Sequence, residues 1–257
     1  MFEARFANAT FLKRIFDAVK DLVEDVNLLC TEDGMELQSM DASHVALISA
    51  TILPDACTVY TCDEPLVLGI KVSIFVKLLK FAEGSDSVIL TQGKDTAKLQ
   101  ISFESSNGGR KSDLEMSLLD IDTEHLNIPD VEYSCSVKLP SSDFSRIVRD
   151  MATMGETTLL SVQEEEVTIT TKGDMGTAKV TLKEDKTSKS EVLWTEVNCS
   201  TPTSMMLALK YLVHFTKAQS IAEQVSIFMS NSVPVYITYD MGDKGSIGYY
   251  LAPKVDE

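Results

Sequence analysis

Hydrophobic positions along this chain follow two different spacings. In four segments apolar residues recur every three or four positions, which predicts amphipathic helices with one buried face. Most of the remaining chain alternates between apolar and polar residues, which is typical of strands with one buried and one solvated face. The predicted helices are residues 9–22, 72–82, 141–152 and 204–219.

The predicted strands are short and numerous. Alternation is clear at 97–103, 114–118, 167–169 and 178–182. Shorter apolar runs predict more deeply buried strands at 45–48, 66–70, 88–90, 159–162 and 225–229. Asn107-Gly108-Gly109 is a strong signal for a hairpin turn. Many antiparallel strands with a few helices predict an α+β fold, in which helices cover one face of a sheet.

The order of elements repeats along the chain. Arg14-Ile15-Phe16 resembles Arg146-Ile147-Val148, which stands 132 positions further on. Length alone permits one large domain or two of about 130 residues, and the repeat favours duplication. We expect one domain at 1–117, a connecting segment at 118–134 and a second domain at 135–257.

The connecting segment is acidic and contains Pro129, and it breaks both spacings. It also holds Leu126, Ile128 and Tyr133, which a fully solvated linker does not need. These residues either fix the linker to the surface or form part of a binding site. The spacing leaves both interpretations open.

Positive charge is concentrated on the four predicted helices of an acidic chain, whose formal net charge is −16. Nine bases and four acids give these segments a net charge of +5, so the remainder carries −21. In each segment two bases lie three or seven positions apart and share a face. A single such helix is more simply an ordinary solvated face, but four together predict a surface for a polyanion. The nine bases are Lys13, Arg14, Lys20, Lys77, Lys80, Arg146, Arg149, Lys210 and Lys217.

Other chemistry is sparse. The five cysteines are scattered without a CxxC pair, and the three histidines stand far apart, so we expect neither a disulfide framework nor a metal site. No phosphate-binding, dinucleotide-binding or nucleophile motif occurs, and we expect no cofactor and no catalysis. No apolar run approaches the roughly 20 residues that span a membrane, and the first residues lack signal-peptide order. We therefore expect an intracellular protein without a membrane partner.

Several longer motifs resemble the proliferating cell nuclear antigen family, the eukaryotic sliding clamps. Leu37-Gln38-Ser39-Met40-Asp41-Ala42-Ser43-His44-Val45 is similar to one signature of that family, and 61–80 is similar to another. Met1–Arg5, Ile128-Pro129, Tyr133-Ser134-Cys135 and residues 249–254 also match. The resemblance covers the full length with little shift in spacing.

The resemblance implies a ring-shaped homotrimer with two similar clamp domains in each chain. Antiparallel sheets would form the outside, and four helices of each chain would line a central pore through which double-stranded DNA passes. The nine helical bases would then face DNA without reading its bases. Subunits would join head to tail through edge strands around residues 110–118 and 176–182.

The resemblance also implies a groove for partner peptides with the pattern Q-x-x-aliphatic-x-x-aromatic-aromatic. The implied partners are DNA polymerases, the clamp loader, flap endonuclease, DNA ligase and other proteins with this motif, and the implied compartment is the nucleus. The positions that match the groove are Met40, His44, Val45, Leu126, Ile128, Pro129, Tyr133, Pro234, Tyr250, Ala252 and Pro253.

Two positions depart from the family pattern. Many members have a ubiquitin-accepting lysine where this chain has Glu164, and Lys172 is the nearest lysine along the sequence. We therefore expect this modification to be lost or moved to another lysine. Asp63-Glu64-Pro65 also lacks the arginine that usually follows Cys-Asp.

Two other functions are compatible with parts of the sequence. A clamp subunit of a damage-checkpoint heterotrimer would share the fold and differ in its clients. An acidic enzyme or adaptor that does not act on DNA is the other possibility. The intact groove motifs favour the sliding clamp over the first alternative, and the paired helical bases and the lack of a catalytic constellation favour it over the second.

Overall fold

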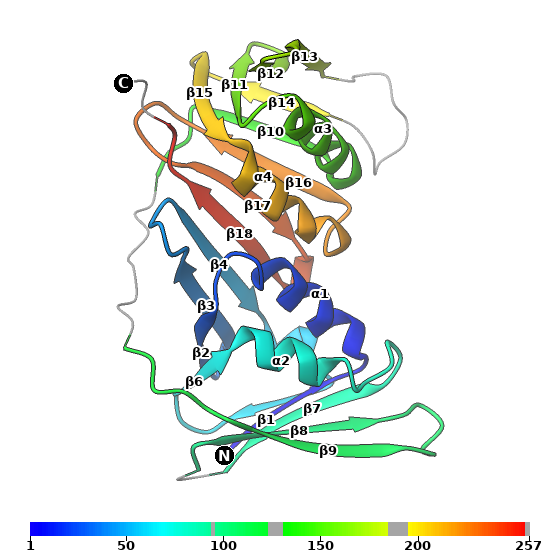
Figure 1. Cartoon of the computed structure of the whole chain (residues 1–257). Coiled ribbons are helices and arrows are strands. Elements are labelled where there is room, and N and C mark those ends of the chain that lie inside the picture. The colour runs from blue at the N-terminus through cyan, green and yellow to red at the C-terminus, as the bar shows by residue number, and fades with distance from the viewer. Residues whose placement is uncertain (94–95, 123–130, 185–194, 255–257) are drawn as a thin grey trace. The chain divides into compact units, whose positions relative to one another are not determined.

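The computed structural model describes residues 1–93, 96–122, 131–184 and 195–254 of the 257-residue chain (Figure 1). Packing divides the chain into two compact units. The first unit comprises Met1–Ala42, Ile48–Leu126 and Met241–Ile247. The second comprises Ser43–Leu47, Asn127–Asp240 and Gly248–Glu257. Residues 43–47 therefore belong to the second unit, although the residues on both sides of them belong to the first. Residues 241–247 belong to the first unit, although the residues on both sides of them belong to the second.

The first unit contains a five-stranded antiparallel sheet with the order β5-β1-β7-β8-β9. A further strand, β2, pairs with both β3 and β6. The 107–109 turn joins β8 to β9 as predicted, with Gly108 at φ 67° and the Gly109 amide donating to Asn107 Oδ1 at 2.9 Å. The strands are β1 (Phe2–Phe6), β2 (Asp25–Thr31), β3 (Gly34–Met40), β4 (Ala46–Ile52), whose first two residues belong to the second unit, β5 (Val59–Cys62), β6 (Leu66–Lys71), β7 (Ser87–Gln92), β8 (Lys98–Glu104) and β9 (Lys111–Ser117).

Two helices pack together on the first unit, α1 (Ala9–Val19) and α2 (Val72–Leu79). Phe16 of α1 and Phe75 of α2 meet edge to face, with ring centroids 4.5 Å apart. Asn8 caps α1 because its side-chain oxygen accepts from the Phe11 amide at 3.3 Å. The apolar face predicted from the spacing is therefore the buried face, and the charged face is left to solvent.

The second unit contains a four-stranded sheet with the order β13-β12-β11-β15 and a second set of strands with the order β14-β10-β16-β17. Phe215 of α4 stacks on Tyr249 of β18 at 4.4 Å in its core. The elements are β10 (Cys135–Pro140), α3 (Ser141–Met154), β11 (Thr157–Gln163), β12 (Glu166–Gly173), β13 (Gly176–Lys183), β14 (Glu196–Cys199), β15 (Thr203–Ala208), α4 (Leu209–Phe215), β16 (Gln224–Met229), β17 (Val235–Asp240) and β18 (Gly245–Leu251), whose first three residues belong to the first unit.

Three 3₁₀ turns complete the described elements: η1 (Pro54–Ala56), η2 (Thr216–Ser220) and η3 (Gly242–Lys244). The predicted α+β class with mostly antiparallel sheets and four helices is confirmed. No helix in the described part of the chain has both the length and the apolar character needed to cross a bilayer.

The predicted fourth helix, 204–219, is wrong at both ends. Residues 203–208 form strand β15, in which Met205 and Leu207 are buried while Ser204 is exposed. That alternation of period two, together with pairing to β11, outweighs the helical spacing. The α-helix is limited to Leu209–Phe215, and the chain tightens into η2 where Lys217 stands. The other three helices begin where predicted, and their ends differ by two or three residues.

The start of the connecting segment lies against the first unit. The Leu119 amide donates to the Gly69 carbonyl at 2.8 Å, and Asn27 Nδ2 donates to the Ile121 carbonyl at 2.9 Å. A Cβ at Gly69 would stand 2.0 Å from the Leu119 oxygen, so glycine is what permits this approach. These contacts fix residues 119–121 to the first unit.

Candidate functional site

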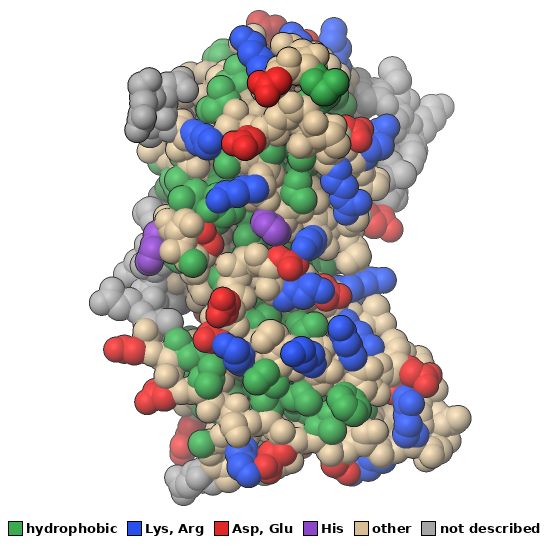
Figure 2. All heavy atoms as spheres, in the orientation of Figure 1, with side chains coloured by type: hydrophobic (Ala, Val, Ile, Leu, Met, Phe, Trp, Pro, Cys, Tyr) green, Lys and Arg blue, Asp and Glu red, His purple; other side chains and the backbone are tan. Residues whose placement is uncertain are grey.

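The predicted basic residues of the first unit lie on the solvent side of α1 and α2. Arg14, Lys77 and Lys80 are exposed, while Leu12, Ile15 and Phe16 of α1 are buried. Figure 2 shows blue side chains over these helices, with acidic side chains between them. The helical spacing thus places the bases where a solvent-side polyanion can reach them.

Some of these bases are already engaged. The Lys20 ammonium lies 2.5 Å from Asp17 Oδ1, one turn away on α1. Lys13 donates to the Ala82 carbonyl at 2.6 Å. Within the described residues, Arg14, Lys77 and Lys80 form no ion pair. Among the described helical bases of the first unit, these three can approach an anion without losing an ion pair.

The second unit repeats this arrangement on α3 and on α4 with η2. Arg146 is paired with Asp143 at 3.0 Å and remains 70% exposed, and Arg149 is exposed. The Lys210 ammonium lies 4.6 Å from the centroid of the Tyr211 ring. Lys217 is half-buried on η2. Surface pairs of this kind contribute about 0–1 kcal/mol, so exchanging an aspartate for a phosphate costs little.

A run of half-buried aromatic rings forms a second surface on the second unit. Tyr236 is at its centre, stacked on Tyr250 at 4.4 Å and on Phe228 at 5.7 Å. Tyr133 lies against both Phe228, at 5.8 Å, and Tyr236, at 6.4 Å. Burial raises the pKa of the Tyr133 and Tyr250 hydroxyls above the ordinary value, so both stay neutral. The surface therefore offers apolar ring faces with neutral hydroxyl groups.

The C-terminal residues run beside this aromatic surface. The Ala252 amide donates to the Val45 carbonyl at 3.1 Å, and the Lys254 amide donates to the Met206 carbonyl at 2.8 Å. Ala252 is exposed and Pro253 is half-buried. A hollow of about 260 Å³ lies next to Pro253 and is also lined by Leu159, Met206 and Ser232.

The structure thus brings together part of the predicted peptide groove. Seven of the predicted groove residues belong to the second unit: His44, Val45, Tyr133, Pro234, Tyr250, Ala252 and Pro253. His44 is exposed in the left-handed region, at φ 54°, and Pro234 is exposed just before β17. Met40 ends β3 in the first unit. Leu126, Ile128 and Pro129 lie outside the described residues.

Two aromatic residues of this surface were missed from the sequence. Phe228 lies within a strand predicted as buried, and Tyr236 follows Pro234 on β17. The alternation of residues in β17 could have identified Tyr236. Val235, Ile237 and Tyr239 form the buried face of this strand, so Tyr236 lies on the other face.

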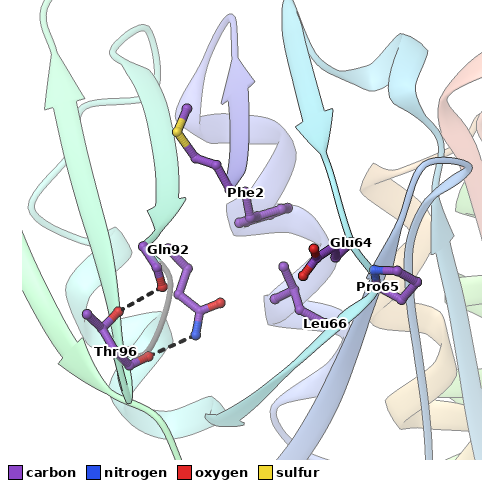
Figure 3. A pocket seen from close by; sticks show the side chains of 8 residues that line it. Phe2, Glu64, Pro65, Leu66, Gln92 and Thr96 are labelled. Atoms are coloured by element: carbon purple, nitrogen blue, oxygen red, sulfur yellow. Dashed lines mark hydrogen bonds between the residues drawn. The ribbon is translucent and has the colours of Figure 1, made fainter.

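A different cleft, of about 480 Å³, lies in the first unit (Figure 3). Phe2 of β1, Leu66 of β6 and Gln92 of β7 point into it, and Gln92 Nε2 donates to the Thr96 carbonyl at 2.9 Å. Of the predicted DNA-facing and groove residues that the structure describes, none lines this cleft. Among the described residues, no three or more His, Cys, Asp or Glu side chains form a group that could hold a metal ion.

The two predicted interface strands are edge strands. β9 pairs only with β8 and β13 pairs only with β12 among the described strands. Glu164 stands in the turn between β11 and β12, exposed and in the left-handed region at φ 48°. Lys172 is exposed near the other end of β12.

Comparison with known proteins gives two family matches and a full-length relative. The family described as proliferating cell nuclear antigen, N-terminal domain, matches residues 1–125. The family described as proliferating cell nuclear antigen, C-terminal domain, matches residues 127–254. The proliferating cell nuclear antigen of Chaetomium thermophilum is 37% identical over 257 residues, which is all of this chain and 99% of that relative.

Proposed function

The chain belongs to the proliferating cell nuclear antigen family and is a DNA sliding clamp, a non-catalytic processivity factor of DNA replication and repair; from this premise we propose that three copies close head to tail into a ring around duplex DNA. Each copy would contribute β9 to one joint and β13 to the next. Retention on DNA then follows from closure of the ring.

The two edge strands support this arrangement. Each presents unpaired backbone groups that another strand can satisfy. β13 carries Lys179 and Lys183, both exposed, while β9 carries Asp113 and Glu115 together with one base, Lys111, and so has a net negative charge. Opposite charge on unlike edges favours β9 of one copy against β13 of the next over pairing of like edges.

The exposed helical bases support a weakly attractive DNA-facing surface. Lysine and arginine on flexible stems can follow phosphates that move past them, without base contacts that would stop sliding. The acidic charge of the remaining chain keeps DNA away from other surfaces. We assign the nine helical bases to this surface.

Topological retention is the direct test of the ring. A loader complex assembles the labelled chain on a closed DNA circle, and the circle is then cut once. We expect a trimer by solution mass, retention on the closed circle through a high-salt wash, and loss after the cut. A monomer by mass, or equal retention before and after cutting, would contradict the ring.

Charge reversal tests the DNA-facing surface separately. The triple variant Arg14→Glu, Lys77→Glu, Arg149→Glu changes exposed bases that form no ion pair within the described residues. We expect it to remain trimeric and to load onto DNA several-fold less well. The matched control Lys138→Glu, Lys172→Glu, Lys244→Glu alters net charge equally at exposed positions outside the four helices. Equal loading by the two variants would contradict the assignment.

We assign the aromatic surface and C-terminal residues of the second unit, together with Met40 and the predicted linker residues, to the peptide groove. Stacked rings beside a small hollow suit aromatic anchors on a short helical turn. The clients in this proposal are polymerases, the loader, flap endonuclease, DNA ligase and other proteins with the Q-x-x-aliphatic-x-x-aromatic-aromatic motif. The proposed compartment is the nucleus, where a replication clamp meets its DNA.

Peptide binding measures the groove directly. We expect Tyr250→Ala to weaken binding of a fluorescent motif peptide by at least roughly tenfold. Pro234→Ala provides a second variant at an exposed position, and we expect a smaller loss. Phe81→Ala removes an aromatic ring that is 60% exposed in the first unit and serves as the control. Unchanged affinity in both groove variants would contradict the assignment.

A further inference from the structure

Two cysteines of the second unit stand opposite each other on neighbouring strands. Cys135 begins β10 and Cys199 ends β14, and the two are partners in the strand register. Their Sγ atoms lie 2.7 Å apart, and both are free thiols. The pairing of strands β10 and β14 therefore holds the two sulfur atoms close together.

The backbone around the pair permits a disulfide. The Ser200 amide donates to the Ser134 carbonyl at 2.9 Å, immediately beside the two cysteines. This makes Cys135 and Cys199 a non-hydrogen-bonded antiparallel pair, whose Cα atoms are typically about 4.5 Å apart. That separation lies within the roughly 4.4–6.8 Å that disulfides span. Bond formation therefore needs little movement of either strand.

The two thiols differ in access. Cys135 is 1% exposed and its thiol donates to the Thr201 carbonyl at 3.1 Å. Cys199 is half-buried on β14, which pairs with β10 alone among the described strands. A reagent in solution therefore meets Cys199 first, with Cys135 held behind it.

We propose that Cys135 and Cys199 form a redox modification site that closes reversibly into a disulfide on reaction with a small-molecule disulfide such as oxidised glutathione. The Cys199 thiol loses its proton and attacks one sulfur of glutathione disulfide, which releases one glutathione and leaves the other bonded to Cys199. The Cys135 thiol then loses its proton and attacks Cys199 Sγ, which expels the second glutathione. Two protein thiols are oxidised and one glutathione disulfide is reduced to two thiols.

The chemistry at Cys199 sets the pace of this reaction. Burial, and then the hydrogen bond with Cys135, raises the pKa of the Cys199 thiol to about 11. The thiolate is the attacking species, so the first step is slow at neutral pH and accelerates about tenfold per pH unit below that pKa. The second step is fast because Cys135 is already in contact.

Closure would fasten an edge strand. β14 has four residues, and the disulfide would join its last residue to the first residue of β10. The link also closes a long loop of chain, which disfavours the unfolded state. The inference rests on this pair alone and is independent of the ring and the peptide groove.

Thiol mapping of the intact chain tests the site. The reduced protein is incubated with oxidised glutathione at mildly alkaline pH, the remaining thiols are alkylated, and peptides are identified by mass spectrometry. We expect free thiols to fall from the five of the sequence to three, with Cys135 and Cys199 in one cross-linked species that a reductant reverses. We expect the oxidised protein to melt roughly 5 °C higher than the reduced one.

Single substitutions identify the order of attack. Cys135→Ser should trap glutathione on Cys199, and Cys199→Ser should abolish the cross-link. Cys57→Ser, at another half-buried cysteine in the first unit, should leave the cross-link unchanged. The proposal is overturned if wild-type protein keeps a stable glutathione adduct on Cys199 or stays reduced at both positions. A cross-linked protein that melts lower would contradict the expected stabilisation.

Discussion

Single residues set the geometry of the aromatic surface. Gly248 lies on β18 beside the Tyr236 ring, and a Cβ there would stand 2.6 Å from Tyr236 Cε2. Real Cβ contacts are longer, so the ring keeps its place only because position 248 lacks a side chain. Tyr236 in turn supports Tyr250 and Tyr133 through stacking. The absence of a side chain at Gly248 therefore lets the rings of Tyr236, Tyr250 and Tyr133 keep their stacked positions.

Gly248→Ala should displace the Tyr236 ring. We expect a loss of about 1–3 kcal/mol in the free energy of unfolding, since the added methyl overpacks a filled site. Motif-peptide affinity should also fall, because Tyr250 loses its stacking partner. Urea denaturation and peptide titration measure the two effects. Gly93→Ala, at a position without a positive φ where the nearest heavy atom to an added Cβ is 4.0 Å away, controls for loss of glycine itself. Unchanged peptide binding in a folded Gly248→Ala protein would contradict this role.

A buried carboxylate in the first unit should make stability depend on pH. The Glu83 amide donates to Asp86 Oδ2 at 2.8 Å, and Arg110 Nη2 donates to the same oxygen at 2.5 Å. The first contact and then the arginine hold the pKa of Asp86 below its ordinary value of 3.8, against the opposing effect of burial. A lowered native pKa means that Asp86 contributes stability above about pH 3.8 and loses it as pH falls through the native pKa.

Asp86→Asn should remove that dependence. We expect the variant to be less stable than wild type at neutral pH, and the gap to narrow steadily below pH 3.8. Urea midpoints across acidic pH measure it. Asp17→Asn, at an exposed aspartate paired with Lys20, should show little change. A gap that stays constant down to the acid transition would contradict the account.

At the level of elements, the sequence was most informative where one pattern was uncontested. Helices α1, α2 and α3 begin where their apolar spacing predicted, and the 107–109 hairpin is confirmed. The helix predicted from residue 204 onward is wrong at its start for a physical reason. Met205 and Leu207 fit both a helical and a strand spacing, and pairing with β11 decides between them.

Phe228 and Tyr236 were missed because a strand that buries one face can carry aromatic rings on the other. Partner distances, such as that between Cys135 and Cys199, depend on register, which local pattern does not specify.

The capping of α1 gives a prediction at this scale. Asn8→Ala removes the side-chain acceptor for the Phe11 amide and should lower the free energy of unfolding by about 1 kcal/mol. Asn8→Asp should keep most of it, since a carboxylate accepts the same bond and suits the helix N-terminus. Thermal unfolding compares the two. Equal losses in Asn8→Ala and Asn8→Asp would contradict the capping role.

At the level of the whole molecule, the proposed ring depends on unlike edges meeting. Reversal of charge on β13 by Lys179→Glu and Lys183→Glu should weaken each joint by roughly 3- to 10-fold at low salt, and less at high salt. Both side chains are exposed, so the fold should be unaffected. Sedimentation across concentrations measures the association. Lys172→Glu with Lys244→Glu is the control of equal charge, and equal association in both double variants would argue against the β9–β13 joint.

Because the two edge strands β9 and β13 differ, a mutation can damage one of them and leave the other intact, and this affects how a mutant allele would be inherited. In the proposed ring, a copy that is damaged only on β13 keeps a sound β9, so it could still bind one neighbouring copy but could not complete the ring. Where normal and altered copies are equally abundant and mix freely, only about one set of three copies in eight would contain normal copies alone and so be able to close. Such an allele would be dominant, because its product withdraws the normal copies from use, whereas an allele that prevents folding would merely halve the supply.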